Sequence, residues 1–257
     1  PPLSANRAAE IPVINPGDCR LNPIEHFADF NTMTLKSDLI VFSDFDGTFT
    51  ARDIGNRIYT HFSGGRNRPL VEDWKKGLIS SRECLTRESE LITATADDIK
   101  AFLNQFELSA SAPETYKELT RHGIPFYILS DGLDFYIDYI LRKFHLEQIP
   151  YCANRAIFDG NRLRIEFPYH NDGCLRCGSC KGVRIKEIVG AQRESIEVIF
   201  IGDGLSDICA LPPSDTVFAR GDLLTYCRNQ HIPAIEYSDF FDILTWFKET
   251  GQVTDWT

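Results

Sequence analysis

Four short apolar runs, each bounded by turn-forming residues, constrain the fold of this chain more than any other feature. They are rich in β-branched and aromatic side chains and lie at residues 39–42, 125–129, 197–201 and 216–219. Runs of this length and composition are typical of strands that are buried on both faces. Helical patterns alternate with them at residues 111–123, 133–145 and 183–189. This alternation predicts an α/β fold in which a doubly wound parallel sheet is covered by helices on both sides.

One long insertion separates the first two predicted strands. Residues 53–110 are too many for a single crossover helix and are predicted to form a small helical cap domain. Within the cap, Thr95 and Asp98 form the capping-box pattern that marks a helix start. Ser111 and Glu114 carry the same pattern, so a helix is expected to begin there as the chain returns to the sheet.

A second insertion, at residues 155–180, has the pattern of a β-hairpin. An Asp-Gly-Asn turn at residues 159–161 precedes the alternating apolar residues Leu163, Ile165 and Phe167. The predicted architecture is therefore a Rossmann-like core with an inserted α-helical cap and a β-hairpin insertion.

The predicted domains follow from these boundaries. Residues 1–36 are expected to form an extended N-terminal arm, because they are rich in proline and lack periodicity. The core is predicted to comprise residues 37–52 and 111–257, with the cap at 53–110 between its two parts.

Composition and charge exclude several classes of protein. The chain has 257 residues, of which 43% are hydrophobic and 25% charged, as in ordinary folded domains. Its formal net charge of −10 disfavours nucleic acid as a partner. No apolar run approaches the roughly 20 residues that a membrane span needs, and the first ten residues lack a secretory pattern. We therefore expect a cytoplasmic protein, monomeric or homodimeric, with no membrane partner.

Acidic residues follow two of the predicted strands. Asp44 and Asp46 come after the first strand, and Asp203 and Asp207 come after the third. Each motif alone has the composition of an ordinary turn. Because parallel strands place their carboxyl ends at one edge of a sheet, however, the four carboxylates are expected to converge. Mg²⁺ would compensate their repulsion, since it prefers carboxylate, water and phosphate oxygens.

Four motifs, in chain order, make the pattern similar to the haloacid dehalogenase superfamily of phosphohydrolases. These are DFDGT at residues 44–48, Ser130, Lys181, and GDGLSD at 202–207. The position of the cap, between the first two motifs, resembles the branch that contains phosphoserine phosphatase.

The resemblance implies a Mg²⁺-dependent phosphomonoesterase that acts on a small phosphorylated metabolite. Asp44 would attack phosphorus to give an aspartyl-phosphate, and Asp46 would act as general acid and base. The metal would be held by Asp44, Asp46 and Asp203, with Asp207 as a further ligand or as a residue that orients one. The residues implied to bind the substrate phosphate are Phe45, Gly47, Thr48, Ser130, Asp131, Gly132 and Lys181, of which Ser130 and Lys181 are also catalytic.

Further segments resemble the methionine-salvage phosphatases, which act on 2-hydroxy-3-keto-5-methylthiopentenyl-1-phosphate. The segments are ISSRECL at residues 79–85, SDGLDFY at 130–136, VFARGDLLTYC at 217–227 and YSDFFDI at 237–243. The cysteine-rich approach to Lys181 is also similar to the phosphoethanolamine/phosphocholine phosphatases. Transfer of the phosphate to another alcohol is a third alternative.

A cysteine cluster precedes Lys181. Cys174, Cys177 and Cys180 have spacing suited to a tetrahedral Zn²⁺ site, with His170 or Cys152 as a possible fourth ligand. Alternatively, the three thiols simply lie in the loop that positions the lysine. A function of a different class, a non-catalytic zinc-binding interaction module, would also use this cluster. The remaining cysteines, Cys209 among them, are expected to be scattered and buried.

Overall fold

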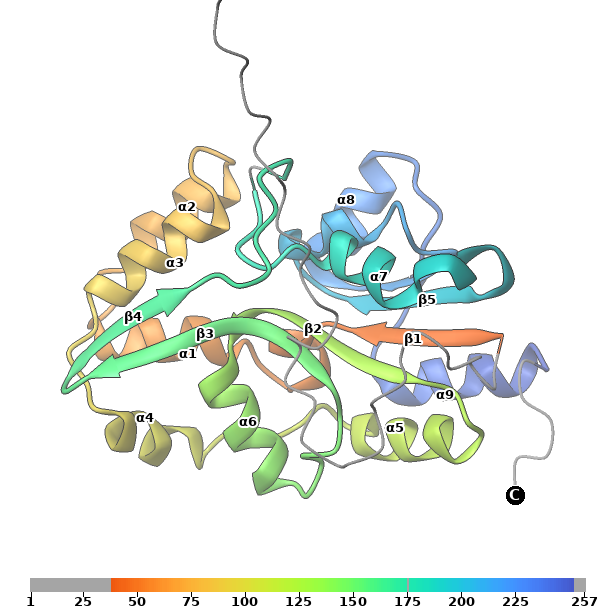
Figure 1. The fold of residues 1–257 in the computed structure, drawn as a ribbon, viewed down its shortest axis with the longest axis horizontal. Helices are drawn as coiled ribbons and strands as arrows, with labels where there is room; N and C mark the ends of the chain where they lie inside the picture. Colours follow the sequence, from red (N-terminus) through yellow and green to blue (C-terminus); the bar gives the residue numbers. More distant parts are fainter. Residues whose placement is uncertain (1–37, 175, 252–257) are drawn as a thin grey trace, which may run out of the picture.

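A seven-stranded sheet forms the centre of the described part of the molecule (Figure 1). The computed structural model describes residues 38–251 except residue 175, so the predicted arm at 1–36 lies outside the described residues. The strands are β1 (Leu39–Ser43), β2 (Phe126–Leu133), β3 (Tyr151–Asp159), β4 (Arg162–Glu166), β5 (Glu197–Gly202), β6 (Thr216–Ala219) and β7 (Ile235–Glu236).

The strand order is β4-β3-β2-β1-β5-β6-β7, and every neighbouring pair is parallel except β3 and β4. In the centre of the sheet, Val41 of β1 lies opposite Phe126 of β2 and Ile199 of β5. This register brings the carboxyl ends of β1 and β5 to the same edge. The predicted Rossmann-like α/β core is confirmed.

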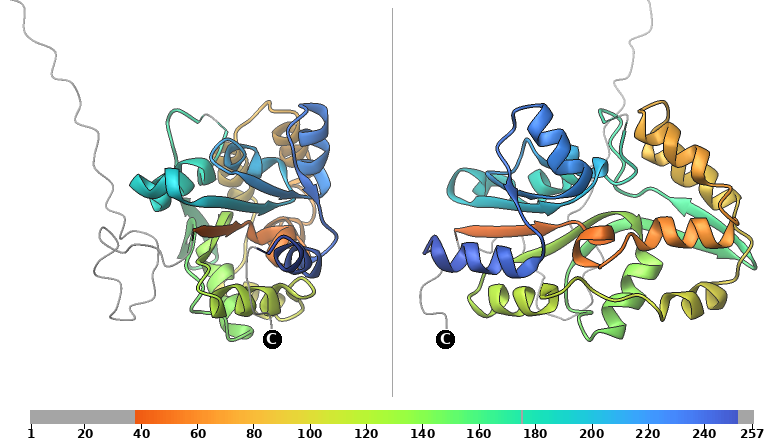
Figure 2. Two further views of the ribbon diagram at one scale, coloured as in Figure 1. Left: turned by 90° about the vertical axis from the view of Figure 1, so that its right-hand side faces the viewer. Right: turned by 180° about the vertical axis from the view of Figure 1, so that it is seen from behind.

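Helices cover both faces of the sheet (Figure 2). One face carries α5 (Ala112–Arg121), α6 (Asp134–Lys143) and α9 (Phe240–Glu249), and the other carries α7 (Lys181–Val189) and α8 (Gly221–Asn229). Alternate residues of β1 point to opposite faces of the sheet. Val41 packs with the helices of the first face, whereas Ile40 and Phe42 pack with those of the second. Because successive side chains of a strand point to opposite faces, a continuous apolar run is what such a sheet requires.

Four helices lie within residues 53–110, the segment predicted to be helical. They are α1 (Ile54–Phe62), α2 (Arg68–Lys75), α3 (Ser81–Glu90) and α4 (Ala96–Leu103). Helix α3 packs against β4 of the hairpin. The backbone N–H of Ala94 donates to the carbonyl of Asn161 in the hairpin turn, at 3.0 Å. The hairpin predicted within residues 155–180 is present, but its first strand begins earlier and is continuous with the central sheet.

The two predicted capping boxes have different outcomes. The Thr95 hydroxyl accepts from the backbone N–H of Asp98 and the Asp98 carboxylate accepts from that of Thr95, so the first is confirmed. The second capping box is absent, because Ser111 has a left-handed backbone (φ 61°) and its side chain makes no cap hydrogen bond, although helix α5 does begin at Ala112 as expected. The segment before Ser111 is fixed by tertiary contacts instead: Ser109 bonds through its backbone N–H to Phe49 and through its hydroxyl to Thr48. Among the described residues, no helix combines the length and the apolar character that crossing a membrane requires.

Candidate active site

Asp44 lies directly after β1, where the strand gives way to a wide helical turn, η2 (Phe45–Phe49). Its carboxylate is 4% exposed, and its backbone N–H donates to Ile201 of β5 at 2.8 Å. Gly47 gives the turn its positive φ of 78°. A Cβ at this position would lie 2.6 Å from Oδ2 of Asp203, so only glycine lets the turn approach that carboxylate so closely.

Lys181 begins α7 and is completely buried. Its Nζ lies 2.5 Å from Oδ1 of Asp44 and also donates to Oδ1 of Asp207. Burial alone would lower the pKa of Lys181, but the charges of Asp207 and Asp44 raise it well above its ordinary value. The lysine is therefore a fixed cation beside the carboxylate of Asp44.

Asp203 and Asp207 follow β5 and complete the acidic group. The Asp203 carboxylate accepts from the Thr48 hydroxyl at 3.0 Å. Both oxygens of Asp207 have partners, because Oδ1 accepts from Lys181 while Oδ2 accepts from the backbone N–H groups of Asp203 and Gly204, at 3.0 and 2.9 Å. Asp207 thus holds both the lysine and the loop that carries Asp203.

Two of these carboxyl groups, those of Asp44 and Asp203, have a raised pKa. Burial raises the pKa of Asp44 well above its ordinary value, and the charges of Asp207 and Asp203 raise it further while Lys181 opposes the shift. Burial and the neighbouring charge of Asp207 raise the pKa of Asp203 to about 7. Such shifts mean that the ionised site lacks sufficient compensating positive charge.

The donor set fits a hard divalent cation. One carboxylate oxygen from each of Asp44, Asp203 and Asp207 lies within 4.8 Å of the others. With all groups ionised, three carboxylates and the ammonium of Lys181 carry a net charge of −2. Oxygen ligands in an incomplete cage, completed by water and substrate, are what Mg²⁺ prefers.

Asp46 lies two residues after Asp44 and contacts the start of α1. Its Oδ1 accepts from the backbone N–H groups of Ile54 and Gly55, at 2.9 and 3.1 Å, and its Oδ2 accepts from the hydroxyl of Tyr136. Burial and the charge of Asp53 nevertheless raise the pKa of Asp46 to about 7, against the effect of these hydrogen bonds. A carboxyl group with this pKa can both give and take a proton near neutral pH.

The end of β2 provides the next group of polar residues. The Ser130 hydroxyl is 1% exposed and accepts from the backbone N–H of Gly132 at 2.9 Å. Asp131 accepts from the backbone N–H of Ser179 at 2.6 Å and from the side-chain amide of Asn154 at 3.2 Å. This stretch therefore ties the end of the sheet to the loop that leads into α7.

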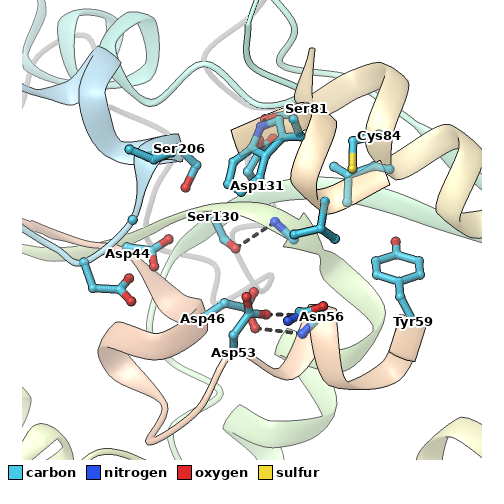
Figure 3. Close-up of a pocket in the computed structure, with 18 of the residues that line it drawn as sticks. Asp44, Asp46, Asp53, Asn56, Tyr59, Ser81, Cys84, Ser130, Asp131 and Ser206 are labelled. Atoms are coloured by element: carbon cyan, nitrogen blue, oxygen red, sulfur yellow. Dashed lines mark hydrogen bonds between the residues drawn. The ribbon is translucent and has the colours of Figure 1, made fainter. Parts of the chain in front are cut away.

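These elements enclose a cavity of about 420 Å³ (Figure 3). Its floor carries Asp44, Asp46, Ser130 and Asp203, and its opposite wall comes from α1, α2 and α3. Among the predicted phosphate-binding residues, Asp131 and Gly132 also line the cavity.

Four predicted phosphate-binding residues do not line the cavity: Phe45, Gly47, Thr48 and Lys181. The side chain of Phe45 is fully buried in the main hydrophobic core. Thr48 is fully buried as well, and its hydroxyl is directed to Asp203. The Thr48 hydroxyl therefore donates to a carboxylate, and the prediction that it binds the phosphate is not met in this structure.

Sequence reasoning missed several residues of the site. Tyr136 contacts Asp46, and Asp53 caps α1 by accepting from the backbone N–H of Asn56 at 2.8 Å. Asp53 has a local signal, since an aspartate before a helical segment is a frequent N-cap. Glu88 of α3 lines the cavity and is 4% exposed, and burial raises its pKa to about 7. Nothing in the local sequence distinguishes Glu88 from a surface residue of an amphipathic helix.

The cysteines also differ from expectation. Cys209 is not a scattered core residue, because its sulfur lies 3.4 Å from that of Cys177. Neither of the expected fourth members joins the cluster. The His170 ring bonds to the Phe167 carbonyl at 2.7 Å, and Cys152 lies in the second hydrophobic cluster.

A parallel sheet that brings an aspartate pair, a buried lysine and a second aspartate pair together at one edge is the arrangement typical of a phosphatase of the haloacid dehalogenase type. Comparisons with known proteins place the chain within that class. The model of the family described as "Putative Phosphatase" matches residues 39–236, and the chain belongs to this family.

Two relatives and one solved structure illustrate the similarity. The 2-hydroxy-3-keto-5-methylthiopentenyl-1-phosphate phosphatase of Bacillus pumilus is 33% identical over 224 residues, covering 84% of this chain and 94% of that protein. The protein of the same name from Geobacillus thermodenitrificans is 30% identical, with 82% and 96% covered. A phosphoserine phosphatase, solved as a phospho-aspartyl intermediate analogue, superimposes with a TM-score of 0.62 at 21% identity, covering 82% of this chain and 99% of that one. The last likeness shows the shared fold.

Proposed function

We propose that this phosphatase is a Mg²⁺-dependent phosphomonoesterase that works through an aspartyl-phosphate and hydrolyses 2-hydroxy-3-keto-5-methylthiopentenyl-1-phosphate. The observation that carries the proposal is the contact of Asp44 with the buried Lys181, at the floor of the cavity and beside Asp203. The names of the relatives support the choice of substrate.

The first half of the reaction breaks the ester bond. A carboxylate oxygen of Asp44 forms a bond to phosphorus while the bond from phosphorus to the ester oxygen breaks. Asp46, with its pKa near 7, gives its proton to the departing oxygen. Lys181 and the hydroxyl of Ser130 bind the phosphate oxygens that are not transferred, and Lys181 needs no reorganisation because it is already fixed beside Asp44.

The second half regenerates the enzyme. Asp46, now ionised, takes a proton from a water molecule as that water attacks phosphorus, and the bond from phosphorus to Asp44 breaks. Inorganic phosphate then leaves. Mg²⁺, when bound by Asp44, the carbonyl of Asp46 and Asp203, supplies charge neutralisation for the phosphoryl group. Both carboxylate oxygens of Asp207 already accept hydrogen bonds. This favours a role for Asp207 in positioning Lys181 and the Asp203 loop over direct binding of Mg²⁺.

Residues 53–110 act in this proposal as the cap that selects the leaving group, over a core formed by residues 37–52 and 111–257. Val71, Trp74 and Leu85 give the cavity an apolar wall that suits a methylthio chain. The Tyr59 hydroxyl is buried with no hydrogen-bond partner in the described part of the chain, and Tyr59 lines the cavity.

A second candidate substrate is phosphocholine or phosphoethanolamine. Glu88, buried in the same wall as the aromatic ring of Tyr59, favours it, because a carboxylate beside an aromatic face suits an ammonium group. The non-catalytic interaction module is not retained, since the chain belongs to a phosphatase family.

Phosphate release from a panel of esters, with and without Mg²⁺, tests the proposal. The methylthiopentenyl phosphate should be turned over faster than phosphocholine, phosphoethanolamine or a generic aryl phosphate. Asp44→Asn should abolish turnover, whereas Asp38→Asn, at an exposed position just before β1, should leave it unchanged. Turnover by Asp44→Asn, or turnover insensitive to chelation, would refute the mechanism. Added alcohols that become phosphorylated would show transfer in place of hydrolysis.

A further inference from the structure

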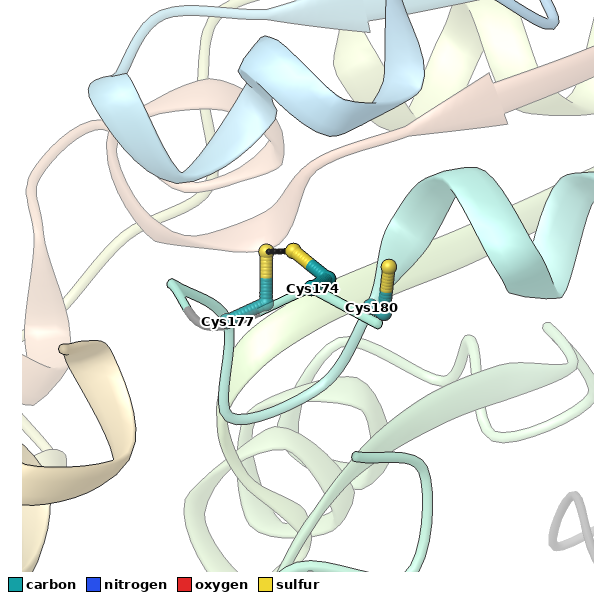
Figure 4. A group of neighbouring side chains, drawn as sticks. All are labelled: Cys174, Cys177 and Cys180. Atoms are coloured by element: carbon teal, nitrogen blue, oxygen red, sulfur yellow. Dashed lines mark hydrogen bonds between the residues drawn. The ribbon is translucent and has the colours of Figure 1, made fainter. Parts of the chain in front are cut away.

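Four thiols from two distant segments meet beside the active site. Cys174, Cys177 and Cys180 belong to the loop between β4 and α7, and their sulfur atoms lie within 4.8 Å of one another (Figure 4). Cys209 comes from the short helical turn η4 (Leu205–Ala210). Its sulfur lies 3.4 Å from that of Cys177, and its thiol also contacts that of Cys180.

The spacing of the sulfurs favours a metal over a disulfide. Four thiolates around zinc, each at about 2.3 Å, are separated from one another by about 3.8 Å. The distance from Cys177 to Cys174 is 3.3 Å and that from Cys177 to Cys209 is 3.4 Å, far longer than a disulfide bond of about 2.05 Å. A disulfide would also use only two of the four thiols, whereas one tetrahedral ion would take Cys174, Cys177 and Cys180, which lie within 4.8 Å of one another, and Cys209, which contacts Cys177, as its fourth ligand.

We propose that Cys174, Cys177, Cys180 and Cys209 bind one structural Zn²⁺ ion. All four are free cysteines, and Cys177 and Cys180 are buried, at 9% and 3% exposure. Zn²⁺ suits the site because four thiolates in a closed tetrahedral arrangement are a typical structural zinc shell. The assignment of Cys209 as the fourth ligand replaces the His170 or Cys152 expected from the sequence.

The ion would join two segments that carry catalytic groups. Cys180 immediately precedes Lys181, and Cys209 lies two residues after Asp207, the partner of that lysine. The backbones are already in close contact, since a Cβ on Gly182 would lie 2.0 Å from the carbonyl oxygen of Cys209. Zinc would therefore fix the start of α7 to η4 and hold Lys181 in register with Asp207. This positioning role rests on the proposed function, whereas the metal site itself does not.

The same loop also meets the cap. The backbone N–H of Ser81, at the start of α3, donates to the carbonyl of Arg176 at 2.7 Å. Trp74 of the cap and Cys177 line a small cavity of about 80 Å³ beside the cluster. A zinc ion that orders the loop would therefore also order the surface on which the cap rests.

Metal content measured without reference to turnover tests the site. Protein loaded with zinc and desalted should retain one ion per chain by mass spectrometry, and Co²⁺ should give the visible bands of a tetrahedral thiolate complex. Cys209→Ala should weaken zinc binding by more than about 100-fold, because a direct ligand is lost. Cys227→Ala is the matched control, since Cys227 is a fully buried cysteine of α8 outside the cluster.

Two outcomes would overturn the site: no retention of zinc by the wild-type chain, or zinc binding by Cys209→Ala as tight as that of the wild type. Should Cys209→Ala fail to fold, Cys209→His restores a ligand and must restore zinc binding.

The positioning role of the zinc ion is measured separately, with zinc-free protein in saturating Mg²⁺. Its kcat should fall at least about tenfold while KM changes little. Undiminished kcat would overturn the positioning role, and neither zinc measurement depends on which ester is hydrolysed.

Discussion

Replacement of Lys181 by methionine tests the charge balance of the site. The variant keeps the length of the side chain but leaves Asp44 and Asp207, whose side chains are 5% and 0% exposed, without their shared cation. Removing one partner of a buried ion pair costs about 3–5 kcal/mol. For a domain of this size that corresponds to a fall in Tm of roughly 10 °C in the absence of divalent ions.

Mg²⁺ should reverse part of this loss. Without the ammonium, the net charge of the ionised site changes from −2 to −3, so the variant should bind Mg²⁺ more tightly than the wild type. An ion present at 100 times its Kd stabilises a protein by about 2.7 kcal/mol. The rise in Tm on addition of Mg²⁺ should therefore be larger for Lys181→Met, although turnover falls by about 100-fold or more because a phosphate-binding cation is lost.

Thermal unfolding followed by circular dichroism, with EDTA and with a Mg²⁺ titration, measures both effects. Lys186→Met is the control, because Lys186 lies on the same helix but is exposed. The destabilisation should also shrink on acidification. The folded-state pKa of Asp44 lies above its unfolded value of 3.8, so the folded protein binds the extra proton and loses stability as the pH rises. A variant as stable as the wild type in EDTA, or one with an equal response to Mg²⁺, would refute the reasoning.

Three further substitutions have measurable outcomes. Burial raises the pKa of Glu88 from 4.5 to about 7, so the wild type should lose up to about 3 kcal/mol of unfolding free energy as the pH rises through that range. Glu88→Gln should remove this pH dependence of stability, measured by urea titrations at a series of pH values. Tyr136→Phe removes a hydrogen bond that lowers the pKa of Asp46, so the alkaline limb of kcat/KM should move up by about one pH unit; an unmoved limb would exclude Asp46 as the acid. Gly182→Ala would place a methyl group 2.0 Å from a backbone carbonyl and should cost about 1–3 kcal/mol in thermal unfolding, whereas an unchanged Tm would contradict the close contact.

The parts of the site that follow from strand order were predictable. Asp44 and Asp203 each follow a buried apolar run, and the parallel register of β1 and β5 brings the two strand ends together. The helix start at Thr95 was predictable because a capping box is satisfied within four residues. At Ser111 the helix start was also predicted correctly but the capping box was not, because contacts of Ser109 with the η2 turn determine the backbone there.

The remaining parts depend on contacts between distant segments. Cys209 lies 29 residues after Cys180, and no periodicity links the two, so only the folded chain shows that their thiols meet. Tyr136 likewise reaches Asp46 across 90 positions. In both cases the local sequence is equally compatible with a residue of the hydrophobic core, and only the tertiary packing shows which polar group the side chain contacts.

Lys181 shows how a local misfit can nevertheless indicate a site. A cation at a helix N-terminus opposes the helix dipole, and a completely buried ammonium adds a desolvation cost. Both terms disfavour the observed position, so partners elsewhere must compensate. The carboxylates of Asp44 and Asp207 compensate the positive charge of the lysine. Together with Asp203 they leave the ionised site with a net charge of −2, which is the condition for binding a divalent cation. The unfavourable placement of the lysine and the predicted need for Mg²⁺ are therefore two consequences of one charge distribution.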